Sequence, residues 1–279
     1  MELQGMDNLN GKTLSILFFG DIMGKPGRKA FISMLSSLKE EFAADMVIAN
    51  GENADDGSGI TPAVMNELFA AGADVLTTGN HIWGNEDIFP VLNRESRLLR
   101  PANISSCVPG HGSGLFEHGG CTVAVLNLIG RVFMPPCDCP FQQAEEEIDR
   151  LLALTPIVVV DFHAEATSEK QALGWLLKDK ASAVIGTHTH VQTADESIAR
   201  EKAAYISDAG MTGPVRSVIG LDPDKTLKAF RKEIPMCFYM AKGECAVQGV
   251  HLLLDAQNGR ALKITRINRP FKTRKPWKS

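Results

Sequence analysis

The sequence predicts an α/β fold, and two observations support this prediction. Short apolar runs alternate with amphipathic stretches over roughly the first 230 residues, after which the pattern changes to strands joined by tight turns. Five of the expected strands are also followed at once by polar residues of the kinds that bind metal ions. Sites in open α/β sheets form beyond the carboxyl ends of strands, so both observations favour the same architecture.

The expected strands are short apolar runs bounded by polar or small residues. In chain order they cover residues 14–19, 46–49, 74–77, 122–126, 157–160 and 181–185. The expected helices carry apolar side chains three or four positions apart, which places these side chains on one face. They cover residues 26–42, 61–72, 143–154, 168–178 and 222–234.

Local signals mark the ends of several elements. Thr61 and Pro62 form an N-cap and first-turn pair, and Gly72 ends the same helix. Asn258 and Gly259 are typical of a hairpin turn. We therefore expect the C-terminal part of the chain to form antiparallel strands, over residues 237–241, 246–254 and 262–267.

We expect one domain over residues 12–268, with flexible termini at 1–11 and 269–279. Residues 84–120 are rich in Gly, Pro and Ser and form either a small cap or an ordinary surface excursion. The C-terminal tail is basic and has no acidic residue, which is typical of a solvated end, with contact to RNA as the alternative.

Composition excludes several classes of protein. The chain has 279 residues and a formal net charge of -4, so it is not a polycation that holds nucleic acid by bulk charge. No apolar run approaches the ~20 residues needed to span a bilayer. The N-terminus lacks the basic flank and apolar stretch of a secretory signal. We expect a cytoplasmic protein with no membrane partner and with its six cysteines reduced.

The polar residues that follow the strands form a recurring pattern. The segments are Gly20-Asp21, Asn50-Gly51-Glu52-Asn53, Gly79-Asn80-His81, Asp161-Phe162-His163 and Gly186-Thr187-His188-Thr189-His190. A glycine beside a ligand lets the backbone approach without a side-chain clash. Residues two apart on an extended chain, such as His188 and His190, face the same way. Five strand ends can therefore converge on one site.

The distribution of histidines supports this interpretation. Four of the seven histidines lie in these segments, namely His81, His163, His188 and His190. The remaining ones have no such context, and we expect them at the surface; they are His111, His118 and His251.

These segments resemble the motifs of the calcineurin-like metallophosphoesterases, and most closely those of their YmdB-like subfamily. Longer segments that also match are residues 100–103, 161–170, 187–195 and 208–214. The resemblance runs from residue 14 to residue 268. It implies a four-layer α/β sandwich, in which two mixed β-sheets are flanked by helices.

The resemblance implies a centre of two metal ions. The first ion would be held by Asp21, Glu52, Asn53 and His190. The second would be held by Glu52, Asn80, His163 and His188, so that Glu52 bridges the two. The wider superfamily has an aspartate in the bridging position, whereas the YmdB-like proteins share the glutamate. Oxygen and imidazole donors without a thiolate suit Fe, with Mn as the alternative.

The resemblance further implies a phosphodiesterase that hydrolyses 2′,3′-cyclic nucleotides. A hydroxide bridging the metal ions would attack in line, with His81 as the general acid. Two alternatives remain: a phosphomonoesterase or protein phosphatase on the same metal site, and a regulatory RNA-binding protein with little turnover. RNA and a second copy of the chain, in a homo-oligomer, are further candidate partners.

Overall fold

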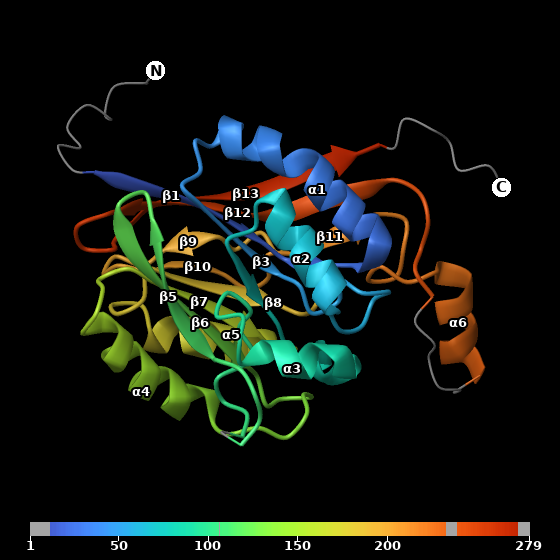
Figure 1. Ribbon diagram of the computed structural model, residues 1–279, viewed down its shortest axis with the longest axis horizontal. Helices are drawn as coiled ribbons and strands as arrows, with labels where there is room; N and C mark the ends of the chain where they lie inside the picture. Colours follow the sequence, from blue (N-terminus) through green and yellow to red (C-terminus); the bar gives the residue numbers. More distant parts are fainter. Residues whose placement is uncertain (1–11, 106, 233–238, 273–279) are drawn as a thin grey trace.

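The computed structural model describes residues 12–105, 107–232 and 239–272. Two β-sheets pack face to face, and helices cover the outer side of each sheet, which gives four layers (Figure 1). The fold class predicted from the sequence is thus confirmed.

The first sheet is mixed and has seven strands in the order β2-β11-β12-β1-β3-β4, with β13 beside β12. Both β3 and β4 run parallel to β1, whereas β12 runs antiparallel to it. The strands are β1 (Thr13–Phe19), β2 (Asp21–Ile22), β3 (Met46–Asn50), β4 (Val75–Thr77), β11 (Met211–Pro214), β12 (Cys245–Asp255) and β13 (Ala261–Phe271).

The second sheet has six strands in the order β5-β6-β7-β8-β10-β9. Its four central strands are parallel, and an antiparallel strand closes each edge. The strands are β5 (Ser113–His118), β6 (Cys121–Ile129), β7 (Val158–His163), β8 (Ala183–Thr187), β9 (Ser197–Ile198) and β10 (Ala204–Ile206).

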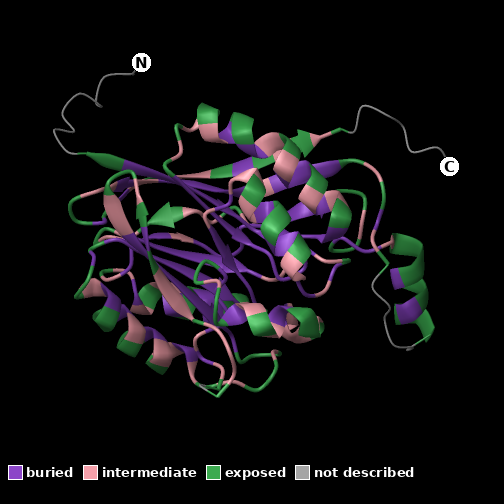
Figure 2. Ribbon diagram, in the orientation of Figure 1, coloured by how far each residue is buried: buried purple, intermediate pink, exposed green. Residues whose placement is uncertain are grey.

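Alternation along the strands builds three apolar layers. In β1, Leu17 and Phe19 pack toward α1 (Gly24–Glu41) and α2 (Pro62–Ala71). Ile16 and Phe18 point the other way, into the layer between the sheets, because successive side chains alternate faces. A third cluster joins the second sheet to α4 (Pro140–Leu152) and α5 (Thr167–Leu176). The central strands are consequently buried on both faces (Figure 2).

The helix signals at Thr61 and Gly72 are confirmed. The Thr61 side chain accepts a hydrogen bond from the Val64 amide at 3.3 Å, and Gly72 ends α2 with a φ of 111°. The helix α6 (Pro223–Lys232) also forms, but it lies at the periphery (Figure 1). Its apolar residues Leu227 and Phe230 are 49% and 67% exposed. Ile234, expected on the same face, lies outside the described residues.

Two expectations about individual segments are wrong. Residues 239–241, the described part of the strand expected over 237–241, make only an isolated bridge between Met240 and Leu221. Within 84–120, the segment from Ser113 to His118 is strand β5, paired to β6, so a cap can comprise only residues 84–112. The rest of that stretch begins at the last residue of the short helix η1 (Asn80–Gly84) and holds two more short helices, η2 (Glu86–Ile88) and α3 (Phe89–Leu92).

The flexible C-terminal tail was expected to begin at residue 269, and this boundary is also wrong. β13 continues to Phe271, because its last residues pair with the start of β12, and the Arg269 guanidinium contacts Glu41 at 2.6 Å. Residues 1–11 and 273–279 lie outside the described residues.

His251, expected at the surface, is instead 8% exposed. It lies on β12, where its Nε2 is 2.9 Å from the Ser15 hydroxyl and its ring packs on Phe42. A position in a strand that is central to the sheet overrides the polar character of the side chain.

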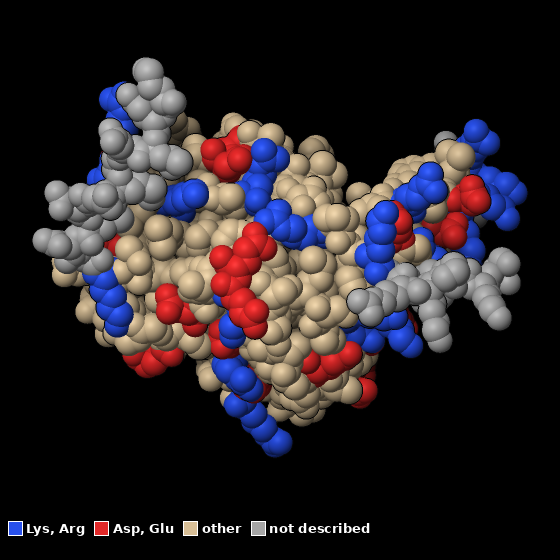
Figure 3. All heavy atoms as spheres, turned by 90° about the horizontal axis from the view of Figure 1, so that it is seen from above, with Lys and Arg blue, Asp and Glu red and all other residues tan. Residues whose placement is uncertain are grey.

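The surface matches the near-neutral composition. Basic and acidic side chains lie intermingled over the face shown in Figure 3. Within the described residues, no helix is long and apolar enough to cross a membrane. The five described cysteines are free thiols; they are Cys107, Cys121, Cys137, Cys139 and Cys245.

Candidate metal centre

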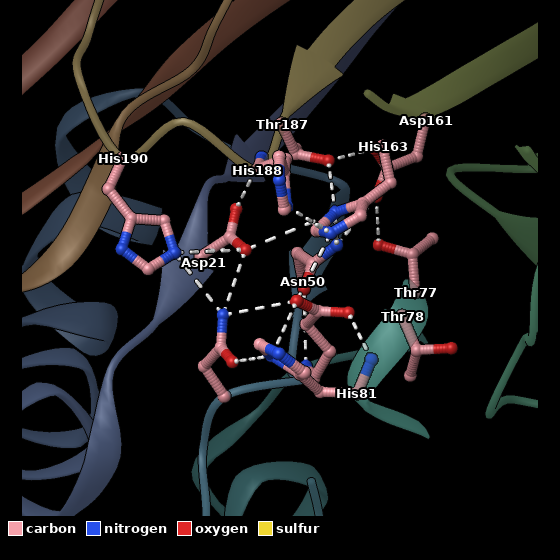
Figure 4. Close-up of polar contacts among 12 residues, drawn as sticks. Asp21, Asn50, Thr77, Thr78, His81, Asp161, His163, Thr187, His188 and His190 are labelled. Carbon is pink, nitrogen blue, oxygen red and sulfur yellow. Dashed lines mark hydrogen bonds and ion pairs between the residues drawn. The ribbon is translucent and has the colours of Figure 1, made fainter. Parts of the chain in front are cut away.

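Most of the predicted site residues come together where strand ends of the two sheets meet, among them Asp21, His81, His163, His188 and His190 (Figure 4). Asp21 follows β1, Glu52 and Asn53 follow β3, Asn80 and His81 open η1 after β4, His163 ends β7, and His188 and His190 follow β8. Asp21 and His190 are distant in the chain, yet Oδ1 of the first is 3.4 Å from Nε2 of the second. The strand-end pattern therefore corresponds to one cluster in space.

Two carboxylates, those of Asp21 and Glu52, lie at its centre with no exposed surface. The Asn53 amide nitrogen is 3.2 Å from Asp21 Oδ1 and 3.2 Å from Glu52 Oε1, so it donates to both. Burial by itself would raise the pKa of each carboxyl group. Nearby imidazoles outweigh burial: His190 lowers the pKa of Asp21, and His163 lowers that of Glu52 well below its usual value.

His163 is fixed by a chain of hydrogen bonds behind it. The Thr187 hydroxyl donates to Asp161 Oδ1 at 2.7 Å and therefore accepts from His163 Nδ1 at 3.0 Å. The other nitrogen, Nε2, is 3.1 Å from Glu52 Oε1. Burial would lower the pKa of His163, but the carboxylate of Glu52 raises it to about 9. The ring thus carries a proton that bonds it to Glu52.

Asp161 anchors this chain and is itself fully buried. It also accepts hydrogen bonds from the Thr77 hydroxyl and from the Asn50 amide. Burial raises the pKa of Asp161 to about 6. Asp161 and His163 share a face of β7 because they are two residues apart.

His188 follows β8, the strand beside β7 in the same sheet, and its ring lies next to that of His163. Its Nδ1 is 3.0 Å from His163 Nε2, and its Nε2 is 3.1 Å from Glu165 Oε2. Burial, and then the charge of His163, lower the pKa of His188 to about 3, so this ring is neutral. Nε2–H consequently donates to Glu165, and the Nδ1 lone pair points at His163 and Glu52.

His190 is oriented by a backbone carbonyl. Its Nδ1 donates to the Ile219 oxygen at 2.8 Å, which leaves Nε2 directed at Asp21. His188, His190 and Ile219 have φ angles of 98°, 64° and 48°, in the left-handed region that non-glycine residues rarely adopt. Such backbone strain is typical of functional sites, where the surrounding structure holds it in place.

A buried ion pair lies behind the loop that carries these two histidines. Asp208 Oδ2 accepts from the Thr189 backbone and hydroxyl at 3.0 and 2.7 Å, and from Lys170 Nζ at 2.7 Å. The side chains of Lys170 and Asp208 are 2% and 1% exposed. Because Thr189 lies between the two histidines, this pair positions both of them.

The cluster fits metal ions by three observations. Ligand atoms of Glu52, His163 and His188 all lie within 4.8 Å of one another. Within the described residues, the buried Asn80 Oδ1 has no hydrogen-bond partner. A buried polar atom without a partner destabilises the folded protein, so this oxygen is available to a ligand. Third, His163 Nε2 lies 3.1 Å from Glu52 Oε1 and 3.0 Å from His188 Nδ1, so three possible ligand atoms face one another. Carboxylate and amide oxygens with imidazoles suit transition metals of intermediate hardness.

Asn53 and His81 lie beside this cluster and contact each other. The Asn53 amide presents its nitrogen to the carboxylates and its oxygen to His81 Nδ1, at 2.7 Å. A metal-ligand role for Asn53 through its oxygen therefore requires the amide to turn over. The His81 amide donates to Glu52 Oε2 at 3.1 Å, and the ring, 29% exposed, lines a cavity of about 210 Å³ in front of the cluster.

The comparison with known proteins identifies the family. A family model described as YmdB-like protein matches residues 17–267. The chain belongs to the YmdB-like family. Among curated proteins, the 2′,3′-cyclic-nucleotide 2′-phosphodiesterase of Bacillus subtilis (strain 168) is 44% identical over 254 residues, which cover 91% of this chain and 96% of that protein.

Two solved structures share this architecture over nearly their whole length. A crystal structure of a novel phosphatase from Mycoplasma pneumoniae superposes with a TM-score of 0.88 at 32% identity, covering 95% of this chain and 96% of that one. A hypothetical protein from Thermus thermophilus gives a TM-score of 0.84 at 37% identity, covering 92% and 99%. The resemblance predicted from the sequence motifs is confirmed.

Sequence reasoning left the supporting residues of this YmdB-like site without a role. Glu165 and Lys170 lie in the matching segment 161–170, and Asp208 opens another such segment. The signal for Asp161 was available, since it precedes a proposed ligand by two positions in a strand. The Ile219 carbonyl could not be found, because any residue type offers a carbonyl oxygen.

The Gly79→Ala substitution tests whether the backbone at residue 79 must lie close to His163 and Glu52. A Cβ at this position would overlap His163 Nε2 and Glu52 Oε2. We expect metal affinity to fall by about 10- to 100-fold, as when ligand support is removed. Gly51→Ala is the control, because the nearest atom to its Cβ would be a methyl carbon of the Ile60 side chain, at 3.3 Å. Isothermal titration with Mn²⁺ measures both, and equal affinities would contradict the close approach.

Asp208→Asn tests the ion pair and leaves the Lys170 charge buried without its partner. The free energy of unfolding should fall by about 3–5 kcal/mol, and Lys170→Met in the same chain should restore part of it. Asp149→Asn breaks the pair with Lys180, whose members are 63% and 36% exposed, and should cost less than about 1 kcal/mol. Urea unfolding of metal-free protein provides the comparison; similar losses in Asp208→Asn and Asp149→Asn would refute the positioning role.

Proposed function

We propose that this protein is a dinuclear-metal phosphodiesterase that hydrolyses 2′,3′-cyclic nucleotides. The observation that carries the proposal is the convergence of buried carboxylates, imidazoles and an orphan amide oxygen at one set of strand ends. The substrate class follows the name of the Bacillus subtilis relative. The broader class, a metal-dependent phosphoric ester hydrolase, is confirmed, since the relatives are named phosphodiesterase and phosphatase.

The two ions would share Glu52, whose Oε1 already contacts both His163 and Asn53. One ion would take Asp21, Glu52, Asn53 and His190, and the other Glu52, Asn80, His163 and His188. Mixed oxygen and imidazole donors without thiolate support Fe, and Mn as the alternative. When bound, such ions supply positive charge for the phosphate and lower the pKa of water near it.

His81 is the proposed general acid. Its Nδ1 lies 3.3 Å from Glu52 Oε1, and this contact orients the ring at the cavity. The contact with Asn53 Oδ1, at 2.7 Å, would be given up when the Asn53 amide turns its oxygen to a metal ion. As water adds to phosphorus and the P–O bond breaks, the ring donates its Nε2 proton to the leaving oxygen. A positioned acid of this kind typically contributes ~10²–10⁴-fold to the rate.

The role of His81 is tested by varying the leaving group. His81→Ala should slow hydrolysis of a 2′,3′-cyclic nucleotide by about 10²–10⁴-fold. A nitrophenyl diester, whose leaving oxygen needs no proton, should be much less affected. His111→Ala, at an exposed histidine, is the control and should keep the wild-type rate on both. Equal losses on both substrates would contradict the acid role.

Metal binding should also appear in stability. For each occupied site, Mn²⁺ at a hundredfold excess over its dissociation constant should raise the free energy of unfolding by about 2.7 kcal/mol. Glu52→Ala, which removes the shared ligand, should abolish most of this gain, and chelation should reverse it in the wild type. Urea titrations with and without Mn²⁺ measure the effect. A gain that persists in Glu52→Ala would place the ions elsewhere.

A further inference from the structure

We propose that Glu165 sets the preference of this site for a singly charged phosphodiester over a doubly charged phosphomonoester. The proposal rests on the proposed function and assigns a specificity-determining residue to it. Glu165 lies two residues beyond His163, where the chain leaves β7. It lines the cavity of about 210 Å³ together with His81, His188 and His190.

Glu165 is the solvent-facing member of the cluster. Its side chain is 47% exposed, whereas those of Asp21 and Glu52 are fully buried. Its Oε2 contacts His188 Nε2 at 3.1 Å, so the carboxylate is held at the mouth of the cavity. A substrate phosphate bound in this cavity would therefore lie in the field of the Glu165 charge.

The cavity has a distinctive charge pattern. Among its described lining residues there is no lysine or arginine, and the fixed acidic groups are Glu52 and Glu165. Whatever ions are bound, the carboxylate of Glu165 lowers the local positive charge at the mouth of the cavity by one unit. A diester carries one negative charge, while a monoester carries close to two at pH 8, since its second pKa is near 6. Glu165 therefore opposes binding of the monoester about twice as strongly as binding of the diester.

Orientation of the His188 ring needs a hydrogen-bond acceptor at position 165, but it does not need a negative charge there. The His188 amide already donates to Asp21 Oδ2 at 3.2 Å, and its ring packs against that of His163 with centroids 4.7 Å apart. An amide oxygen could accept from His188 Nε2 equally well. The Glu165 charge and its hydrogen bond can therefore be separated by one substitution, Glu165→Gln.

The same carboxylate would act on the product. Hydrolysis converts a diester with one charge into a monoester with two, so repulsion from Glu165 increases as the P–O bond breaks. Product binding is weakened relative to substrate binding, which favours release. Glu165→Gln should therefore strengthen inhibition by phosphate as well as hydrolysis of monoesters.

The experiment compares bis(p-nitrophenyl) phosphate with p-nitrophenyl phosphate on Mn-loaded protein at pH 8. Glu165→Gln should raise the monoester-to-diester ratio of kcat/KM on the order of tenfold, because one charge–charge repulsion is lost. Glu165→Asp should keep the wild-type ratio. Glu146→Gln, an exposed residue on α4 with the same change in net charge, should have no effect. The dissociation constant for inorganic phosphate, measured by calorimetry, should fall by a similar factor in Glu165→Gln alone.

Metal content per chain, measured for each variant, keeps the outcomes distinct. An unchanged ratio and unchanged phosphate affinity in Glu165→Gln with full metal content would overturn the proposal. Loss of metal with parallel loss of both activities would also overturn it and reduce Glu165 to a positioning residue for His188. A wild type that binds no metal would instead refute the proposed function. Phosphate binding needs no turnover, so it tests Glu165 even where neither ester is hydrolysed.

Discussion

The structure depends on one unfavourable placement: the carboxylates of Asp21 and Glu52 lie close together with no access to solvent. Two buried like charges are tolerated only beside compensating positive charge. In the metal-free chain, His163 supplies it, since Glu52 raises the pKa of its ring to about 9. Metal ligands must be deprotonated, so this proton and a bound cation are alternatives at one position.

Three imidazoles face the two buried carboxylates, and each is oriented by a different kind of partner. His163 donates to a hydroxyl backed by Asp161, His190 to a main-chain carbonyl, and His188 to the exposed Glu165. As a result, Nε2 of two rings and Nδ1 of the third face inward. The outer nitrogen of each ring is hydrogen-bonded, which fixes both tautomer and rotation. The strained φ angles of His188 and His190 let one short loop deliver two of these rings.

The sequence predicted the alternation of strands and helices and the clustered side chains because both depend on simple periodicity, whereas the four layers were implied by the resemblance to the metallophosphoesterases. Buried parallel strands are apolar runs, and their carboxyl ends share an edge, so Asp21, Glu52 and His163 could be grouped without coordinates. β5 was missed because Phe116 is its only buried side chain, which leaves a weak signal. His251 was misplaced because its burial depends on the neighbours of β12, which are distant in sequence. Long-range packing of this kind has no local signature.

The groups that orient the three imidazoles differ in their exposure to solvent, and this difference separates metal binding from charge selectivity. The partners of His163 and His190 are buried or in the backbone, so changing them would disturb packing or leave polar groups unsatisfied. Glu165 is half exposed and can be altered at the mouth without opening the core. On the proposed function, metal binding would depend on the buried layer of this centre and charge selectivity on its exposed layer. Substitution of Glu165 would then change the preferred phosphate ester, while the buried ligands, supported by Asp161 and Asp208, would still hold the ions.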